Sequence, residues 1–334
     1  MHSRTLVNET LAAVINRIGA RLVPCLQPFH NRTGRLAVLA ICVSHTFASS
    51  ANCQEIEPRK YANTPVGVNF LIAGYSWTQG GLASDGSLPI DKPDLETISG
   101  LLGFARSLDL WGRSGKFDVS VPYTWLDGTA IYDGTPVTRN VDGFGDALMR
   151  ISVNLYGSPA LPLRDFASFK QDLIVGAALQ ASLPFGLYDH ARALNIGTNR
   201  WFVKPSLGVS KATGQWVWEA TGAATFYGDN DDYFGGVTRS QDPLYSLQAH
   251  VIRDFRPGLW ASVDVTYYTG GSTTLDGTAK RDLQRNWRVG GTIAVPVNRH
   301  NSLKFFASDG VSSRTGYDYT MLGIGWQYRW GGGI

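Results

Sequence analysis

The sequence predicts an all-β fold, a transmembrane antiparallel up-and-down β-barrel of about 12 strands preceded by a signal peptide. Three observations predict it. Segments in which apolar and polar residues alternate recur after residue 60, long and short connections alternate between them, and aromatic residues gather at both ends of the segments. Alternation with a period of two is typical of strands whose two faces meet different surroundings.

The first 51 residues are interpreted as a leader and signal peptide. The longest apolar run, residues 36–43, follows Arg32 and Arg35 and precedes the small residues FASSAN, which is the order of a secretory signal. Eight apolar residues fall far short of the ~20 that a spanning helix needs, which disfavours a membrane anchor. We therefore expect a leader over 1–51, a short mature N-terminal segment over 52–65, and the barrel over 66–334.

The charge balance changes once this leader is set aside. The whole chain has 30 Lys and Arg against 27 Asp and Glu. Five of those bases and one acid lie within residues 1–51, which leaves 25 bases and 26 acids. This near-neutral balance gives no electrostatic reason to expect a nucleic-acid partner. Only Cys53 remains of the three cysteines, so an internal disulfide is not possible.

Twelve alternating segments follow, each of about the length that a tilted membrane-spanning strand needs. In KFDVSVPYTW (116–125), for example, five apolar residues alternate with Lys, Asp, Ser, Pro and Thr. One segment departs from the pattern, because Arg106 shares the phase of Leu102 and Phe104; either a bulge there resets the register or the assigned phase is wrong. The segments are 66–78, 95–111, 116–126, 145–156, 171–184, 200–210, 215–227, 244–254, 259–269, 286–297, 302–308 and 317–330.

The connections indicate how the strands are joined. Short ones are expected at 113–115, 211–214, 255–258 and 298–301, and a medium one at 157–168. Long polar loops lie between them, at 80–91, 127–141, 185–199, 228–242 and 270–284. Brief turns at one end and long loops at the other are typical of outer-membrane barrels, as are aromatic girdles at both ends. Such a barrel must close, since hydrocarbon offers no partner to unpaired backbone groups.

Three stretches carry a family resemblance: GFGDALMRISVNLY (143–156), LPFGLYD (183–189) and LNIGTNRWFVKPSLGVSK (194–211). They resemble the outer-membrane family named for the MetA pathway of phenol degradation, over roughly residues 61–330. The resemblance implies export to the bacterial outer membrane, a β-barrel, and uptake of aromatic or other apolar small molecules. It assigns no functional residue by position.

The polar phase of the strands supplies the candidate pore-lining residues. They would set the preference of a permeation path, or they would fill a narrow barrel with salt bridges and hydrogen bonds. At about twelve strands both roles are compatible, because the interior is wider than in an eight-stranded barrel. The candidates are Lys116, Asp118, Asp146, Arg150, Asn154, Gln180, Lys204, Glu219, His250, Asp264, Arg288 and Lys304.

Prolines form a second set of candidates. Pro122, Pro184 and Pro205 are assigned to the polar phase, toward the external half of their strands. Because proline cannot donate to the strand ladder, each marks either the end of pairing near the rim or a kink that opens a lateral gap. Such a gap would let an apolar solute leave into the membrane.

We therefore expect a channel that passively admits small hydrophobic or aromatic compounds, with the outer-membrane lipid bilayer and the solute as its partners. No cofactor, metal site or nucleotide motif is predicted, and no enzyme. A hydrolase would need His250, and residues 229–232 (DNDD) could bind Ca²⁺, although a solvated loop is the simpler reading. The alternative from another class is a non-conducting structural or adhesive barrel. The sequence leaves the oligomeric state open.

Overall fold

The structure is a computed structural model that describes residues 56–81, 90–315 and 318–334. The expected leader, residues 1–51, and Cys53 lie outside these described residues. Within the described part no helix combines the length and the apolar character needed to cross a membrane.

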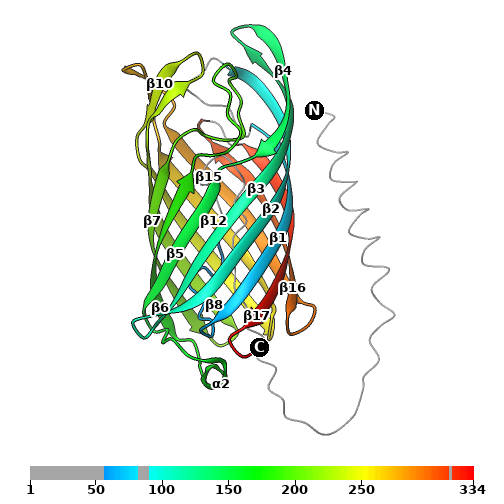
Figure 1. The fold of residues 1–334 in the computed structure, drawn as a ribbon, viewed down its shortest axis with the longest axis vertical. Coiled ribbons are helices and arrows are strands. Elements are labelled where there is room, and N and C mark those ends of the chain that lie inside the picture. Colours follow the sequence, from blue (N-terminus) through cyan, green and yellow to red (C-terminus); the bar gives the residue numbers. More distant parts are fainter. Residues whose placement is uncertain (1–55, 82–89, 316–317) are drawn as a thin grey trace, which may run out of the picture. The chain divides into compact units, whose positions relative to one another are not determined.

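Twelve antiparallel strands form a closed ring, which confirms the predicted barrel (Figure 1). The first strand pairs with the last, from Val68–Gly331 to Gly80–Tyr319, and so closes the sheet. Around the ring the strands are β1 (Val68–Gly80), β2 (Ile90–Leu110), β3 (Arg113–Tyr132), β5 (Ala147–Tyr156), β6 (Leu173–Leu183), β7 (Phe202–Thr213), β8 (Trp216–Tyr227), β11 (Leu244–Arg256), β12 (Leu259–Gly270), β15 (Gln284–Pro296), β16 (Asn301–Ser313) and β17 (Tyr319–Gly331).

The two ends of the barrel differ as the loop lengths predicted. The lower end in Figure 1 carries the short turns and the single-turn helix α2 (Leu163–Phe166). The upper end carries β4 (Thr135–Phe144), which pairs with β3, and a small four-stranded sheet. That sheet contains β9 (Asn230–Tyr233), β10 (Val237–Gln241), β13 (Thr273–Leu275) and β14 (Thr278–Ala279).

The expectation of a polar loop over 127–141 was wrong. These residues form the upper parts of β3 and β4, which pair from Tyr123–Phe144 to Tyr132–Thr135. The hairpin turns through Asp133 and Gly134, which have φ values of 45° and 75°. Two positive φ angles are what a two-residue hairpin turn with the sheet's natural twist requires, and Asp-Gly supplies them readily.

Alternating burial separates an inner from an outer face. In β6, for instance, every second residue from Ile174 to Ser182 is buried, and the intervening ones are partly or fully exposed. The outer face carries exposed aromatic residues near both ends of the strands: Tyr75, Trp125, Trp201, Phe226 and Trp287 at the long-loop end, and Trp111, Trp216, Trp218, Trp326 and Trp330 at the other.

The bulge expected at Arg106 is absent from the described pairing. Strand β2 pairs with β1 and with β3 without a register shift around this residue. Arg106 is exposed and lies on the outer face together with the exposed Leu102. Because the residue lies only a few positions from the end of β2, its long side chain can extend toward water while its stem covers apolar surface.

Candidate functional site

The interior of the barrel is crossed by residues 56–65, which we call the luminal segment. It precedes β1, and most of its residues are buried, including the charged Glu57, Arg59 and Lys60. Its contacts reach the inner face of β3, β5, β6, β7, β8, β11, β12 and β15. A ten-residue segment therefore touches two thirds of the strands in the wall.

Buried ion pairs fix the first half of the luminal segment. Arg150 bridges two carboxylates, donating from Nη1 to Glu57 Oε1 at 2.7 Å and from Nε to Asp118 Oδ1 at 3.0 Å. Glu57 also pairs with Lys60 at 2.8 Å. Arg59 pairs with Asp254 and lies over the Trp260 ring, 5.0 Å from its centroid. Removing one partner of such a network leaves a buried charge unpaired, which lowers the stability of the fold by about 3–5 kcal/mol.

Backbone groups of the luminal segment are bound by wall side chains. Glu219 Oε2 accepts the Arg59 N–H at 2.6 Å. Lys116 Nζ donates to the Lys60 carbonyl at 3.0 Å, and Asn154 Nδ2 donates to the Tyr61 carbonyl at 3.0 Å. The inward polar residues thus replace the strand partners that this irregular segment lacks.

Tyr61 packs into a recess made by two glycines. Gly176 on β6 and Gly208 on β7 are directly paired across the strands. A Cβ atom on Gly176 would lie 2.2 Å from the Tyr61 ring, and one on Gly208 would lie 2.4 Å from it. The Tyr61 hydroxyl lies 3.2 Å from Ser206 Oγ, to which Lys60 Nζ donates at 3.1 Å.

Ten of the twelve candidate lining residues are buried, and Asp118 and Lys304 are half-buried. Four of them, Lys116, Arg150, Asn154 and Glu219, contact the luminal segment directly. Arg288 donates to the Tyr319 carbonyl and to Ser308. Gln180 and Lys204 face each other across β6 and β7. The structure thus brings four of the twelve into contact with the luminal segment, while the role of the set in permeation stays a prediction.

His250 and Asp264 form a separate buried pair on β11 and β12. His250 Nδ1 lies 2.8 Å from Asp264 Oδ1, and Ser262 Oγ donates to Asp264 Oδ2 at 3.0 Å. This is the arrangement of a base and its orienting carboxylate in hydrolases. In those enzymes Nε2 bonds a nucleophile, whereas here Nε2 has no hydrogen-bond partner in the part of the chain that the structure describes.

Backbone pairing changes beside each of the three candidate prolines, but only Pro205 lies in a gap within a paired strand. Next to Pro122 the partner of β3 changes from β5 to β4, with Ser120–Leu148 and Tyr123–Phe144 as the flanking pairs, and the Pro122 carbonyl accepts the Gly145 N–H at 3.0 Å between them. Strand β6 ends at Leu183, immediately before Pro184. Between β7 and β8 the pairs skip from Val203–Phe226 to Ser206–Ala223, which leaves Pro205 in the gap. Of the three prolines, Pro122 and Pro184 thus mark a partner change and a strand end, and Pro205 marks a gap between β7 and β8.

The assignment of Pro205 to the inward phase was wrong. Lys204 is buried and Pro205 is exposed. Successive residues of a strand point to opposite faces, so an inward Lys204 requires an outward Pro205. The proline ring therefore lies on the outer, lipid-facing side of the gap.

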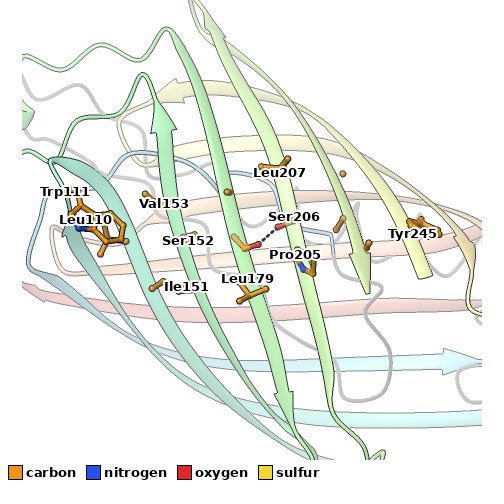
Figure 2. Close-up of a pocket in the computed structure, with 15 residues that line it drawn as sticks. Leu110, Trp111, Ile151, Ser152, Val153, Leu179, Pro205, Ser206, Leu207 and Tyr245 are labelled. Carbon is orange, nitrogen blue, oxygen red and sulfur yellow. Dashed lines mark hydrogen bonds between the residues drawn. The ribbon is translucent and has the colours of Figure 1, made fainter. Parts of the chain in front are cut away.

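An apolar groove of about 590 Å³ lies on the outer face around this gap (Figure 2). Leu179, Pro205 and Leu207 line its outer part. Its lining also includes inward residues, among them Ser152, Ala178 and Ser206. Ser206 is the residue that contacts Lys60 and Tyr61 of the luminal segment. Ser206 thus belongs to the groove lining, and its hydroxyl contacts the luminal segment.

The long-loop end is tied together by polar contacts. The Asp146 carboxylate, at the break between β4 and β5, accepts the N–H groups of Gly186 and Thr198 at 2.9 and 2.8 Å. The Tyr188 hydroxyl donates to the Asp232 carbonyl at 3.0 Å, and partial burial raises the pKa of that phenol. His190 contacts the Asp232 side chain. Within the described residues no group of three or more His, Cys, Asp or Glu could hold a metal ion.

The luminal segment is the part of the site that sequence reasoning missed. Glu57, Arg59 and Lys60 form a charged cluster directly ahead of the first strand, and this cluster is the signal that could have found it. The facing glycines of β6 and β7 are a second signal, because glycine inside a strand often marks the close approach of another group.

Comparisons with known proteins agree with this architecture. The family "Putative MetA-pathway of phenol degradation" matches residues 78–326. The crystal structure of an outer membrane channel from Pseudomonas putida F1 matches with a TM-score of 0.67 and 21% identity, covering 83% of this chain and all of that one. The β domain of the Bordetella autotransporter BrkA matches with a TM-score of 0.46 and 12% identity, covering 79% of this chain and all of that one. No curated protein matches.

The likeness to the Pseudomonas putida outer membrane channel shows the fold. Together with the closed twelve-stranded ring and the apolar outer face, it places the protein in the bacterial outer membrane, as the sequence predicted.

Proposed function

The chain belongs to the MetA-pathway of phenol degradation family, and from that premise we propose that it is a channel that passively admits small hydrophobic or aromatic compounds. The observation that carries the proposal is the apolar groove at the Pro205 gap, whose lining includes Ser206, the residue that contacts the luminal segment. The matching Pseudomonas putida protein is itself described as an outer membrane channel.

The proposed route runs from the long-loop end into the lumen and then sideways through the wall. The luminal segment lies across the axial path and fills it with buried charges, which disfavours straight passage of an apolar solute. The skipped pairs around Pro205 leave one position between β7 and β8 that the strand ladder does not hold. A solute leaving there enters hydrocarbon, where apolar surface is stable.

The proposal is tested by uptake into vesicles whose outer leaflet contains lipopolysaccharide, which slows unassisted entry of apolar solutes. Phenolic and alkyl solutes are compared with sugars of similar size, with and without the protein. We expect the protein to accelerate the phenolic and alkyl solutes and to leave the sugars nearly unchanged. Equal acceleration of both solute classes would show that the protein is a general porin without preference for apolar solutes.

One observation favours a different function. The luminal segment crosses the interior and contacts most of the wall, as it would in a non-conducting structural or adhesive barrel. In that case the hairpin of β3 and β4 and the small sheet at the same end would contact outside partners. Solute uptake into the same vesicles distinguishes the channel from the non-conducting barrel, because a non-conducting barrel accelerates uptake of neither solute class.

A further inference from the structure

Three exposed arginines gather where β15 begins and β16 ends, at the long-loop end of the barrel. Arg285 is the second residue of β15, Arg281 lies four residues ahead of it, and Arg314 directly follows β16. None of the three forms an ion pair with another residue in the part of the chain that the structure describes. Like charges that gather without an internal counter-charge raise the local concentration of anions.

Two of these arginines are neighbours across the strands. The last pair of the β15–β16 ladder joins Asn286 to Ser313, and the next residue beyond it is Arg285 on one strand and Arg314 on the other. The Arg314 N–H donates to Asn286 Oδ1 at 3.1 Å, which keeps Arg314 against β15. Like charges directly opposite each other on neighbouring strands are destabilising. An anion bound between the two guanidinium groups would remove that repulsion.

The other arginines of the long-loop end already have partners within the protein. Each donates to a carbonyl, pairs with a carboxylate or lies over a tyrosine ring. The pairs are Arg139 with Leu194, Arg192 with Asp189, Arg200 with Tyr227 and Arg239 with Tyr233. The group at β15 and β16 therefore differs from the rest of this end in having its positive charges directed to the outside.

Nearby acidic residues are engaged elsewhere. In the connection that leads into β15, Asp276 accepts a backbone N–H of β10 at 2.8 Å. Asp282 is buried and accepts the backbone N–H and the hydroxyl of Thr273 at 2.9 and 2.5 Å. On the outer face of β16, Asp309 accepts from the Thr320 hydroxyl at 2.6 Å. These contacts hold three carboxylates of the same region away from the arginines.

The height of Arg285 on the barrel matches the headgroup layer of the outer leaflet. Two residues further along the same face of β15 lies Trp287, whose ring is 4.6 Å from that of Tyr267. Exposed tryptophan and tyrosine mark the membrane–water interface. Arg285 lies about 7 Å beyond them toward the long loops. Guanidinium groups bind phosphate through paired hydrogen bonds, and phosphate is the charged group of this layer.

Apolar surface continues from the aromatic pair into the membrane. Val289 and Ile293 follow Trp287 on the outer face of β15, and Val263 lies on the outer face of the neighbouring β12. All three are exposed. The surface therefore offers arginines to a phosphorylated headgroup and, below them, branched apolar side chains to acyl chains.

We propose that Arg285, Arg314 and Arg281 form a binding site for the phosphate groups of lipid A, the part of lipopolysaccharide that lies in the outer leaflet. Arg285 and Arg314 hold one phosphate between them, Arg281 adds a third positive charge, and the acyl chains lie against Val289 and Ile293. The site is independent of the proposed channel function, because β11 and β12 separate it from the gap beside β8.

The test is native mass spectrometry of the full-length protein in detergent micelles, which counts bound lipid molecules. The probes are lipid A with both phosphates and lipid A with its phosphates removed. We expect the wild-type protein to bind the phosphorylated lipid about tenfold more tightly, and Arg285→Gln and Arg314→Gln each to remove most of this preference. Arg192→Gln is the control, because it removes an exposed charge from the same end that Asp189 already pairs with.

A competition experiment distinguishes the lipid from a free anion. Inorganic phosphate at the concentration of the lipid should not displace lipid A, since the acyl chains and the second phosphate add to the affinity of one molecule. Displacement would show a site for small anions and would overturn the lipid assignment. Equal binding of the two lipids by the wild-type protein would overturn the site without any variant. Wild-type preference in both Arg285→Gln and Arg314→Gln, each shown to be folded by heat-modifiable migration on gels, would also overturn it.

Discussion

Two glycines on the inner wall determine where the luminal segment can rest. Gly176 and Gly208 leave a recess that the Tyr61 ring fills, and Tyr61 in turn contacts Ser206 beside the wall gap. Any side chain at either position would occupy the same space as the ring. The position of the luminal segment therefore depends on residues that carry no side chain at all.

Gly176→Ala is predicted to displace Tyr61 and loosen the luminal segment. The added methyl group would lie 2.2 Å from a ring atom, and overpacking of this kind costs about 1–3 kcal/mol. We expect larger and more frequent openings in single-channel recordings. Gly222→Ala is the matched control, because a Cβ there meets nothing within 4 Å. Identical recordings for Gly176→Ala and the wild type would contradict this role of Tyr61.

Among the secondary-structure elements, the strands could be predicted and the luminal segment could not. Residues such as Leu173, Val175 and Ala177 meet lipid, so their alternation with inward residues is visible in the sequence. The luminal segment has no period, because its partners come from many strands and are brought together only when the ring closes. Its charges were visible, but nothing local indicated that they would be buried.

Two errors in the candidate site have local causes. Pro205 was assigned inward together with Lys204, although neighbouring strand residues cannot share a face. The polar character of residues 127–141 favours a loop, whereas the Asp133–Gly134 pair within them is the signal of a two-residue hairpin turn between strands. By contrast, the inward position of His250 and Asp264 followed from phase alone, whereas their mutual hydrogen bond required the register of β11 on β12.

Deleting residues 56–65 is predicted to open the lumen along its axis. The strands keep all their ladder pairs, because none of these residues belongs to the ring. We expect a several-fold rise in ion conductance in planar bilayers, since the buried charges would then face a water-filled interior. Unchanged conductance in a variant that still migrates as a folded barrel would show that the luminal segment does not limit ion flow.

The whole molecule combines a closed ring with one weakened part of its wall. Closure by β1 and β17 satisfies the backbone where lipid cannot. The gap in pairing at Pro205, between β7 and β8, lies in the apolar groove. The luminal segment contacts the inner side of the same wall through Ser206. These features together support a lateral route in which apolar solutes leave through the wall between β7 and β8.

A reversible disulfide cross-link, or staple, across the β7–β8 gap tests the lateral route most directly. Pro205→Cys and Ala224→Cys place two thiols opposite each other on the outer face of the gap, in a background with the three native cysteines changed to Ser. Val209→Cys with Ala220→Cys staples the same two strands where they pair normally, and serves as the control. The measurement is the rate at which N-phenylnaphthylamine, which fluoresces in hydrocarbon, enters the membrane of the lipopolysaccharide-containing vesicles. The account predicts that the oxidised Pro205–Ala224 staple abolishes protein-dependent entry, that reduction restores it, and that the control staple has no effect. Entry at the wild-type rate through the oxidised staple would contradict it.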